Sequence, residues 1–131
     1  MVRALLRGDA RECFLGSVRL FFGGWLLFVG LSKVLGGPAG FVGYIESEFA
    51  ATWLPGALVA LLAWVILVAE PLVGGWLLVG KRQRLAWLCA AALMFLLMIG
   101  KTILRDFATV ANNWQYLVLC LAAAAWTRAD E

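Results

Sequence analysis

The chain contains no histidine, and its three cysteines, Cys13, Cys89 and Cys120, stand far apart with no C-x-x-C pair. Without histidine it lacks bis-histidine haem ligation, the usual zinc and copper sites and imidazole acid–base chemistry. Isolated cysteines in apolar runs are mostly small buried hydrophobes, so we expect neither a disulfide framework nor a dithiol relay. The sequence therefore predicts no metal site, no intrinsic cofactor and no self-contained catalytic centre.

Charge is also scarce. Only 15% of the residues are charged, against about a quarter in a soluble domain, whereas 64% are hydrophobic and the mean hydropathy is +0.92. A chain of 131 residues has too little interior to hide so much apolar side chain from water. We expect a single transmembrane domain over residues 1–131, bathed in membrane lipid. The net charge of +3 is scattered without a basic face, which argues against a nucleic-acid partner.

Apolar stretches long enough to cross a bilayer recur four times along the chain. The predicted spans are approximately residues 13–35, 57–80, 85–104 and 112–127. Between the first two, residues 41–53 mix aromatic and acidic side chains, as in a short amphipathic helix at the membrane surface. The predicted fold is therefore all-α, an integral membrane four-helix bundle with one interfacial helix.

Basic residues predict the orientation, because cytoplasmic loops are enriched in lysine and arginine. Seven basic residues fall on the side of the two termini: Arg3, Arg7, Arg11, Lys81, Arg82, Arg84 and Arg128. Only three fall on the opposite side: Lys33, Lys101 and Arg105. We expect a multi-pass protein of the bacterial inner membrane with both termini in the cytoplasm.

Glu70 is the most informative single residue, because it lies about eleven residues inside the second span and is followed by Pro71. A carboxylate at this depth costs about 2.5–3.5 kcal/mol on insertion scales and needs a partner. Arg19 enters the membrane from the same side, so the sequence predicts an intramembrane Arg19–Glu70 pair. Two interpretations stay open: the pair only fixes helix packing, or it handles a ligand or a proton.

A second polar cluster is predicted at the outer face, where the first, third and fourth spans end. Its members are Lys33, Glu46, Glu48, Lys101, Arg105, Asp106, Asn112, Asn113 and Tyr116. These residues are either solvated helix ends with snorkelling lysines, or a vestibule whose cations attract an anionic or quinone-like headgroup. A bound quinone or lipid is the small molecule that the second interpretation implies.

Several of these motifs together resemble the DoxX-like family of small four-helix bacterial membrane proteins, which is related to MauE-type proteins. The resemblance covers roughly residues 19–116 and rests on three segments. They are "VRLFFGGWLLFVGLSKVLGG" with Arg19, Gly30 and Lys33, "AEPLVGGWLLVGKRQRLAWLCA" with Glu70 and Gly74, and "NNWQYLVL" at the start of the last span.

This resemblance implies a membrane anchor or accessory subunit of a quinone- or thiol-linked redox complex, with Arg19, Lys33, Glu70 and Asn113 as the positions to test. MauE-type proteins are implicated in the maturation of disulfide-containing partners, a role for which this chain shows no cysteine pair. Partners would be lipids and other membrane or membrane-associated subunits, or further copies of the chain. The alternatives are a purely structural subunit and a small transporter or proton-conducting protein that uses Glu70.

Overall fold

The protein is described by a computed structural model that covers residues 2–128. These residues form helices and no strands. In chain order the six helices are α1 (Val2–Arg7), α2 (Ala10–Leu35), α3 (Pro38–Phe49), α4 (Gly56–Val79), α5 (Gln83–Ile103) and α6 (Phe107–Trp126). The all-α expectation is thus confirmed for the described part of the chain.

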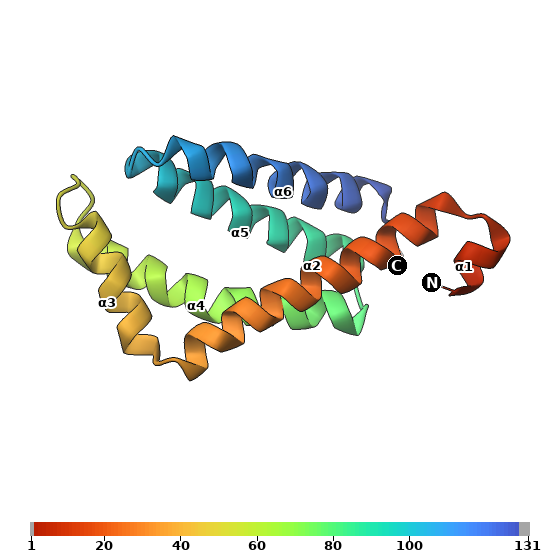
Figure 1. The fold of residues 1–131 in the computed structure, drawn as a ribbon, viewed down its shortest axis with the longest axis horizontal. Coiled ribbons are helices and arrows are strands. Elements are labelled where there is room, and N and C mark those ends of the chain that lie inside the picture. The colour runs from red at the N-terminus through yellow and green to blue at the C-terminus, as the bar shows by residue number, and fades with distance from the viewer. Residues whose placement is uncertain (1, 129–131) are drawn as a thin grey trace.

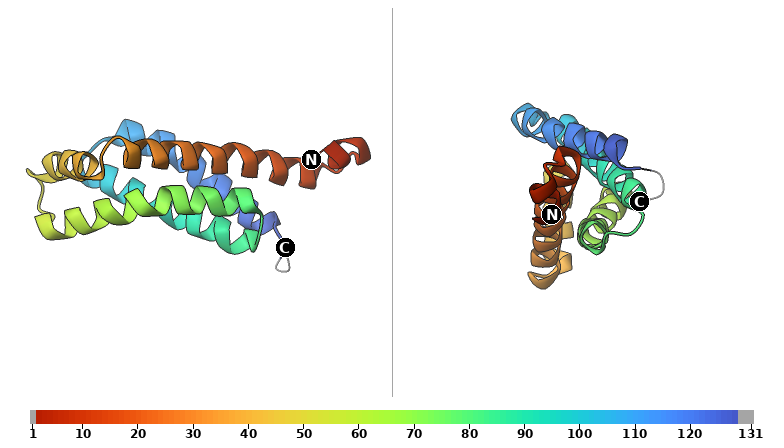
Figure 2. Two further views of the ribbon diagram at one scale, coloured as in Figure 1. Left: turned by 90° about the horizontal axis from the view of Figure 1, so that it is seen from below. Right: turned by 90° about the vertical axis from the view of Figure 1, so that its right-hand side faces the viewer.

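The four long helices run alternately up and down and form two antiparallel pairs, α2 with α4 and α5 with α6 (Figure 1). The pairs meet at the end where α4 turns into α5, and they diverge toward the opposite end, as the arms of a V (Figure 1). Short α3 packs across the start of α4 at the open end. Seen from below, the molecule is elongated, and α1 projects beyond the closed end (Figure 2, left).

The helix ends follow from local chemistry. Asp9 accepts hydrogen bonds from the backbone amides of Arg11 and Glu12 and caps α2. Gly80 ends α4 with a φ of 87°, a left-handed conformation that suits glycine. Asp106 caps α6 by accepting a hydrogen bond from the Thr109 amide. Each of these three ends therefore coincides with a residue type that favours it.

Three of the helices in the described part of the chain, α2, α4 and α5, are long and apolar enough to cross a membrane. Helix α6 covers the fourth predicted range but begins at Phe107 rather than near residue 112. Its first half carries Asn112, Asn113 and Gln115, which lower its hydropathy. Membrane-spanning helices are thus confirmed, whereas α6 as a fourth span stays a prediction.

The buried core lies at the closed end of the V. Its largest fully buried side chains are those of Leu77 from α4, Trp87 from α5 and Cys120 from α6. Phe22 of α2 joins them, with its ring centroid 5.9 Å from that of Trp87. One cluster therefore connects all four long helices where the α4–α5 turn holds the two pairs together.

Helices α2 and α4 approach each other at glycines. A Cβ atom added at Gly30 would lie 2.5 Å from Cδ of Pro71. A Cβ added at Gly74 would lie 2.5 Å from the Leu27 amide nitrogen and 2.7 Å from the Gly23 carbonyl oxygen. Small residues of this kind let two helix backbones come together in a membrane. These contacts also set the register between the two helices.

The neighbouring glycines Gly74 and Gly75 provide a matched test of this close contact. A Cβ at Gly75 would meet nothing within 4 Å. We expect Gly74→Ala to destabilise the protein by roughly 1–3 kcal/mol because the added methyl overpacks the interface. Gly75→Ala should be neutral or slightly stabilising because alanine has the higher helix propensity. Thermal unfolding of both variants in detergent measures the difference, and equal midpoints would contradict the close packing.

Candidate functional site

The most deeply buried charged group in the described part of the chain is Glu70, whose exposed fraction is 3%. Both of its carboxylate oxygens lie 3.0 Å from Nζ of Lys33, so the lysine donates to each of them. Lys33 stands near the end of α2 and Glu70 in the second half of α4. The ion pair therefore connects the two helices at the level where α2 ends and α3 begins.

The predicted partner of Glu70 was wrong: the structure pairs the carboxylate with Lys33 and not with Arg19. The antiparallel register places Gly30 opposite Pro71 and Arg19 beside Gly80. Ten residues separate Gly80 from Glu70, which is about 15 Å along a helix. Arg19 therefore lies too far toward the closed end to reach Glu70, and Lys33 turns inward instead of snorkelling outward.

Arg19 occupies a different environment, near the C-terminal end of α4. Its Nη1 would lie 2.7 Å from a Cβ atom added at Gly80, so glycine leaves the room that the guanidinium uses. The Nε atom is buried and has no hydrogen-bond partner among the described residues. Arg19 thus belongs with the basic turn between α4 and α5 and not with the intramembrane pair.

Two neighbours complete the surroundings of the ion pair. The Phe41 ring of α3 lies under the ammonium of Lys33, with Nζ 4.7 Å from the ring centroid, a cation–π geometry. Pro71 follows Glu70 and packs on Gly30 without interrupting α4, which continues to Val79. The proline therefore lies inside a continuous helix.

Sequence reasoning missed both Phe41 and the role of Gly30. A signal for Gly30 was present, because it lies three residues before Lys33 and hence on the same helix face. No comparable signal existed for Phe41, whose position depends on how α3 folds back. The Lys33–Glu70 pair, with Phe41, Gly30 and Pro71 around it, is the candidate functional site.

The structure divides the predicted outer cluster. It brings Glu48, Lys101 and Asp106 together: Nζ of Lys101 lies 3.9 Å from Oε2 of Glu48 and 3.9 Å from Oδ2 of Asp106. It places Lys33 with Glu70 instead. The other members are distributed as follows: Glu46, Arg105 and Asn112 are exposed, Asn113 is half-buried, and Tyr116 stacks on Trp25.

Hydrogen bonds shift the pKa values of two groups at this outer cluster, Asp106 and Tyr44. The Thr109 hydroxyl and amide donate to the carboxylate of Asp106 and lower its pKa. The cap on α6 is therefore charged at neutral pH, and its contribution is lost only as the pH falls through this lowered pKa. The Tyr44 hydroxyl donates to Glu48 at 2.8 Å, and this bond raises the pKa of the tyrosine.

The cysteines lie apart in the fold as well as in the sequence. Cys120 is buried in the core, whereas Cys13 and Cys89 are half-buried, and all three are free thiols. Within residues 2–128 no three cysteine, aspartate or glutamate side chains gather closely enough to hold a metal ion. Among the described residues, the charged groups that come together are the buried Lys33–Glu70 pair and the looser cluster around Lys101.

The ion pair predicts an asymmetric response to substitution. Lys33→Met leaves the Glu70 carboxylate buried and unpaired, which should cost roughly 3 kcal/mol. Adding Glu70→Gln to that variant removes the buried charge, so more than half of the lost stability should return. The coupling free energy follows from thermal unfolding of both single variants and the double variant in detergent. Additive losses would show that the two side chains do not interact.

Comparison with known proteins shows the family. A family model described as methylamine utilisation protein MauE matches residues 11–113. No curated protein and no solved structure matches the chain. The match runs through α2, α3, α4 and α5 into the first part of α6, and it contains every residue of the candidate site.

The assignment to the DoxX-like family was therefore wrong. The features that suggested it were a basic residue in the first span, an acidic residue in the second and glycine pairs before a basic turn. Any small helical membrane protein with a buried ion pair needs similar residues, so these features do not discriminate between families. The quinone link that came with that resemblance has no support from the match. The chain belongs to the family of methylamine utilisation protein MauE.

Proposed function

We propose that this chain is an accessory membrane subunit of a methylamine-utilisation system, which it serves by holding a partner protein at or in the membrane. The observation that carries the proposal is the family match over residues 11–113, which includes all three helices able to span a membrane. The assignment to methylamine utilisation rests on the name of the family. The membrane location and the accessory role rest on the helices and on the chemistry of the site.

The geometry of the ion pair favours an accessory role over proton conduction. Lys33 engages both oxygens of Glu70, and the pair lies against the closest contact between α2 and α4. Such a pair specifies how two helices dock. Large apolar side chains on their outer faces, among them Phe21, Phe28 and Leu72, are exposed to lipid or to a partner helix.

The fold also supports a specific orientation in the membrane. The start of α2, the α4–α5 turn and the end of α6 lie at the same end of the bundle (Figure 1). The basic turn at residues 81–84 and Arg11 are therefore gathered at one end, with Arg19 beside them. We place this end in the cytoplasm of a bacterial inner membrane, with α6 as the fourth span.

Reporter fusions test the orientation. A fluorescent protein fused after residue 131 should be bright, because it folds in the cytoplasm, and alkaline phosphatase fused there should be inactive. A fusion within the turn between α5 and α6, near Arg105, should give the opposite result. Equal reporter behaviour at the two positions would show that α6 does not cross the membrane.

A growth experiment tests the function. In the bacterium that encodes the chain, deletion should abolish growth on methylamine as sole nitrogen source and leave growth on ammonium unchanged. The wild-type gene and the Gly75→Ala variant should restore growth, whereas Lys33→Met should restore it poorly because less folded protein accumulates. Growth of the deletion strain on methylamine at the wild-type rate would contradict the proposal.

Uptake of radiolabelled methylamine separates an accessory subunit from a transporter. Cells that lack the chain should take up methylamine at the wild-type rate, because the defect lies in a partner that depends on this subunit. Loss of uptake in the deletion strain, together with Glu70-dependent flux in vesicles that contain only this chain, would establish the transporter instead. A partner that co-purifies with the tagged chain in mild detergent would identify the subunit that it serves.

A further inference from the structure

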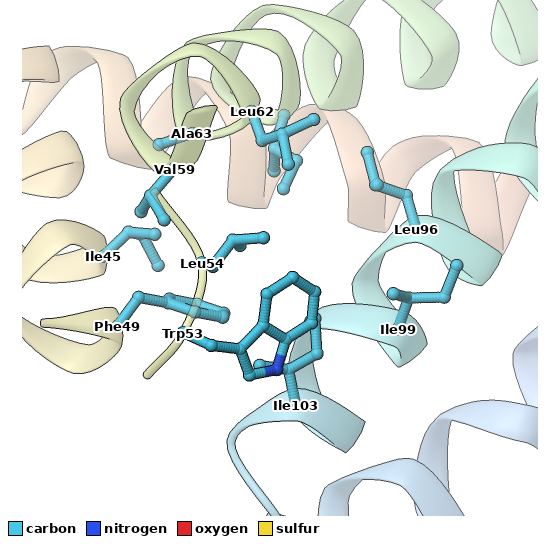
Figure 3. A pocket seen from close by; sticks show the side chains of 12 residues that line it. Ile45, Phe49, Trp53, Leu54, Val59, Leu62, Ala63, Leu96, Ile99 and Ile103 are labelled. Carbon is cyan, nitrogen blue, oxygen red and sulfur yellow. The ribbon is translucent and has the colours of Figure 1, made fainter. Parts of the chain in front are cut away.

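The open end of the V contains an apolar cavity of about 220 Å³. It is enclosed by α3, the loop that leads to α4, the first half of α4 and the second half of α5. Figure 3 shows Ile45 and Phe49 of α3 on one side, Leu62 of α4 above, and Leu96 and Ile99 of α5 on the other. Apart from Gly100, every lining residue contributes an apolar side chain.

The shape of the cavity limits its occupant. Its lining runs from Val59 to Ile66 on α4 and from Ile103 to Leu96 on α5, seven residue steps in each case and so about 10 Å along the helices. The cavity is therefore short, and its walls are apolar along both helices.

Water is a poor occupant, because an apolar wall offers it no hydrogen-bond partners. An apolar cavity of about 150 Å³ in a soluble protein stays dry and binds benzene. Here the surrounding solvent is lipid, whose hydrocarbon chains lie roughly parallel to the helices that line the cavity. One hydrocarbon chain fits both the size and the direction.

Charged groups lie one residue along the chain from two of the residues that line the cavity. Phe49 and Gly100 line it, and their sequence neighbours Glu48 and Lys101 form the outer ion pair. The 3.9 Å separation of that pair is too long for a hydrogen bond, and Oε2 of Glu48 is buried without a hydrogen-bond partner among the described residues. With Asp106, the three groups carry a net charge of −1.

We propose that this cavity binds one acyl chain of an aminophospholipid such as phosphatidylethanolamine, whose headgroup lies at Glu48 and Lys101. The lipid ammonium donates a hydrogen bond to the partly exposed Glu48 carboxylate, and the lipid phosphate accepts one from Lys101. A choline headgroup has no N–H donor for Glu48, and a glycerol headgroup adds negative charge beside two carboxylates. The charges at the outer end therefore favour the amine.

Lipid retention tests the apolar part of the site. The full chain is reconstituted into vesicles with equal amounts of phosphatidylethanolamine, phosphatidylcholine and phosphatidylglycerol, extracted in mild detergent and analysed by native mass spectrometry. We expect one retained phosphatidylethanolamine per wild-type chain. Leu62→Trp fills the cavity and should lose the lipid, whereas Leu61→Trp should keep it, because Leu61 is 59% exposed on the lipid-facing side.

A second cavity-filling variant tests whether the loss of lipid in Leu62→Trp is caused by misfolding. Leu96→Phe fills the cavity from α5 and should also lose the lipid while the thermal midpoint stays near the wild-type value. The inference is overturned if the wild-type chain retains no phospholipid, or if Leu62→Trp and Leu96→Phe retain as much as Leu61→Trp. Retention of a prenylated quinone in place of phospholipid, when both are supplied, would also overturn it.

The headgroup is tested on α3, where Glu46 provides the matched control. Glu48→Gln removes the anionic acceptor and should reduce the preference for phosphatidylethanolamine over phosphatidylcholine by roughly tenfold, the effect of one hydrogen bond to a charged group. Glu46→Gln changes the net charge equally at an exposed position and should leave the preference intact. Equal retention of the two lipids by the wild-type chain would refute the assigned headgroup.

Discussion

The close contact between α2 and α4 is the constraint on which the rest of this structure depends. In hydrocarbon, a carboxylate and an ammonium are tolerable only when each satisfies the other. The Lys33–Glu70 pair meets that requirement at 3.0 Å. The pair can form because Gly30 lets Pro71 approach without a Cβ atom between the two backbones. Packing and charge therefore impose the same register, and that register decides where every other polar group of α2 lies.

The same register explains the shape of the bundle. Helix α4 extends past the end of α2, so α3 finds a surface on α4 at the open end, and Phe41 reaches the ammonium of Lys33. At the closed end, Trp87 and Cys120 bring α5 and α6 into one core with α2 and α4. Tight packing at one end and an apolar cavity at the other follow from two helix pairs joined by a short turn.

Composition and sequence pattern were not enough to distinguish one family of small membrane proteins from another. Helix lengths and basic clusters follow from the bilayer, and intramembrane ion pairs follow from the cost of lone charges, so unrelated small membrane proteins share all of them. Those features indicate a membrane protein correctly, but they led to the DoxX-like family, whereas the family model over residues 11–113 assigns the chain to MauE. Function accordingly rests on the family match and on the site, not on the bundle alone.

The sequence by itself determined the helical class, the apolar spans and the need of Glu70 for a cationic partner, because these depend on side-chain hydropathy and helix length alone. It also predicted a short helix over residues 41–53 between the first two spans, and α3 lies there, from Pro38 to Phe49. Only the tertiary structure decided that the partner is Lys33. Two cations, Arg19 and Lys33, were available at opposite ends of α2. The glycine contacts between α2 and α4 place Lys33 level with Glu70, whereas Arg19 lies beside Gly80, about 15 Å further along α4. Neither helix propensity nor hydropathy predicts the relative axial position of α2 and α4.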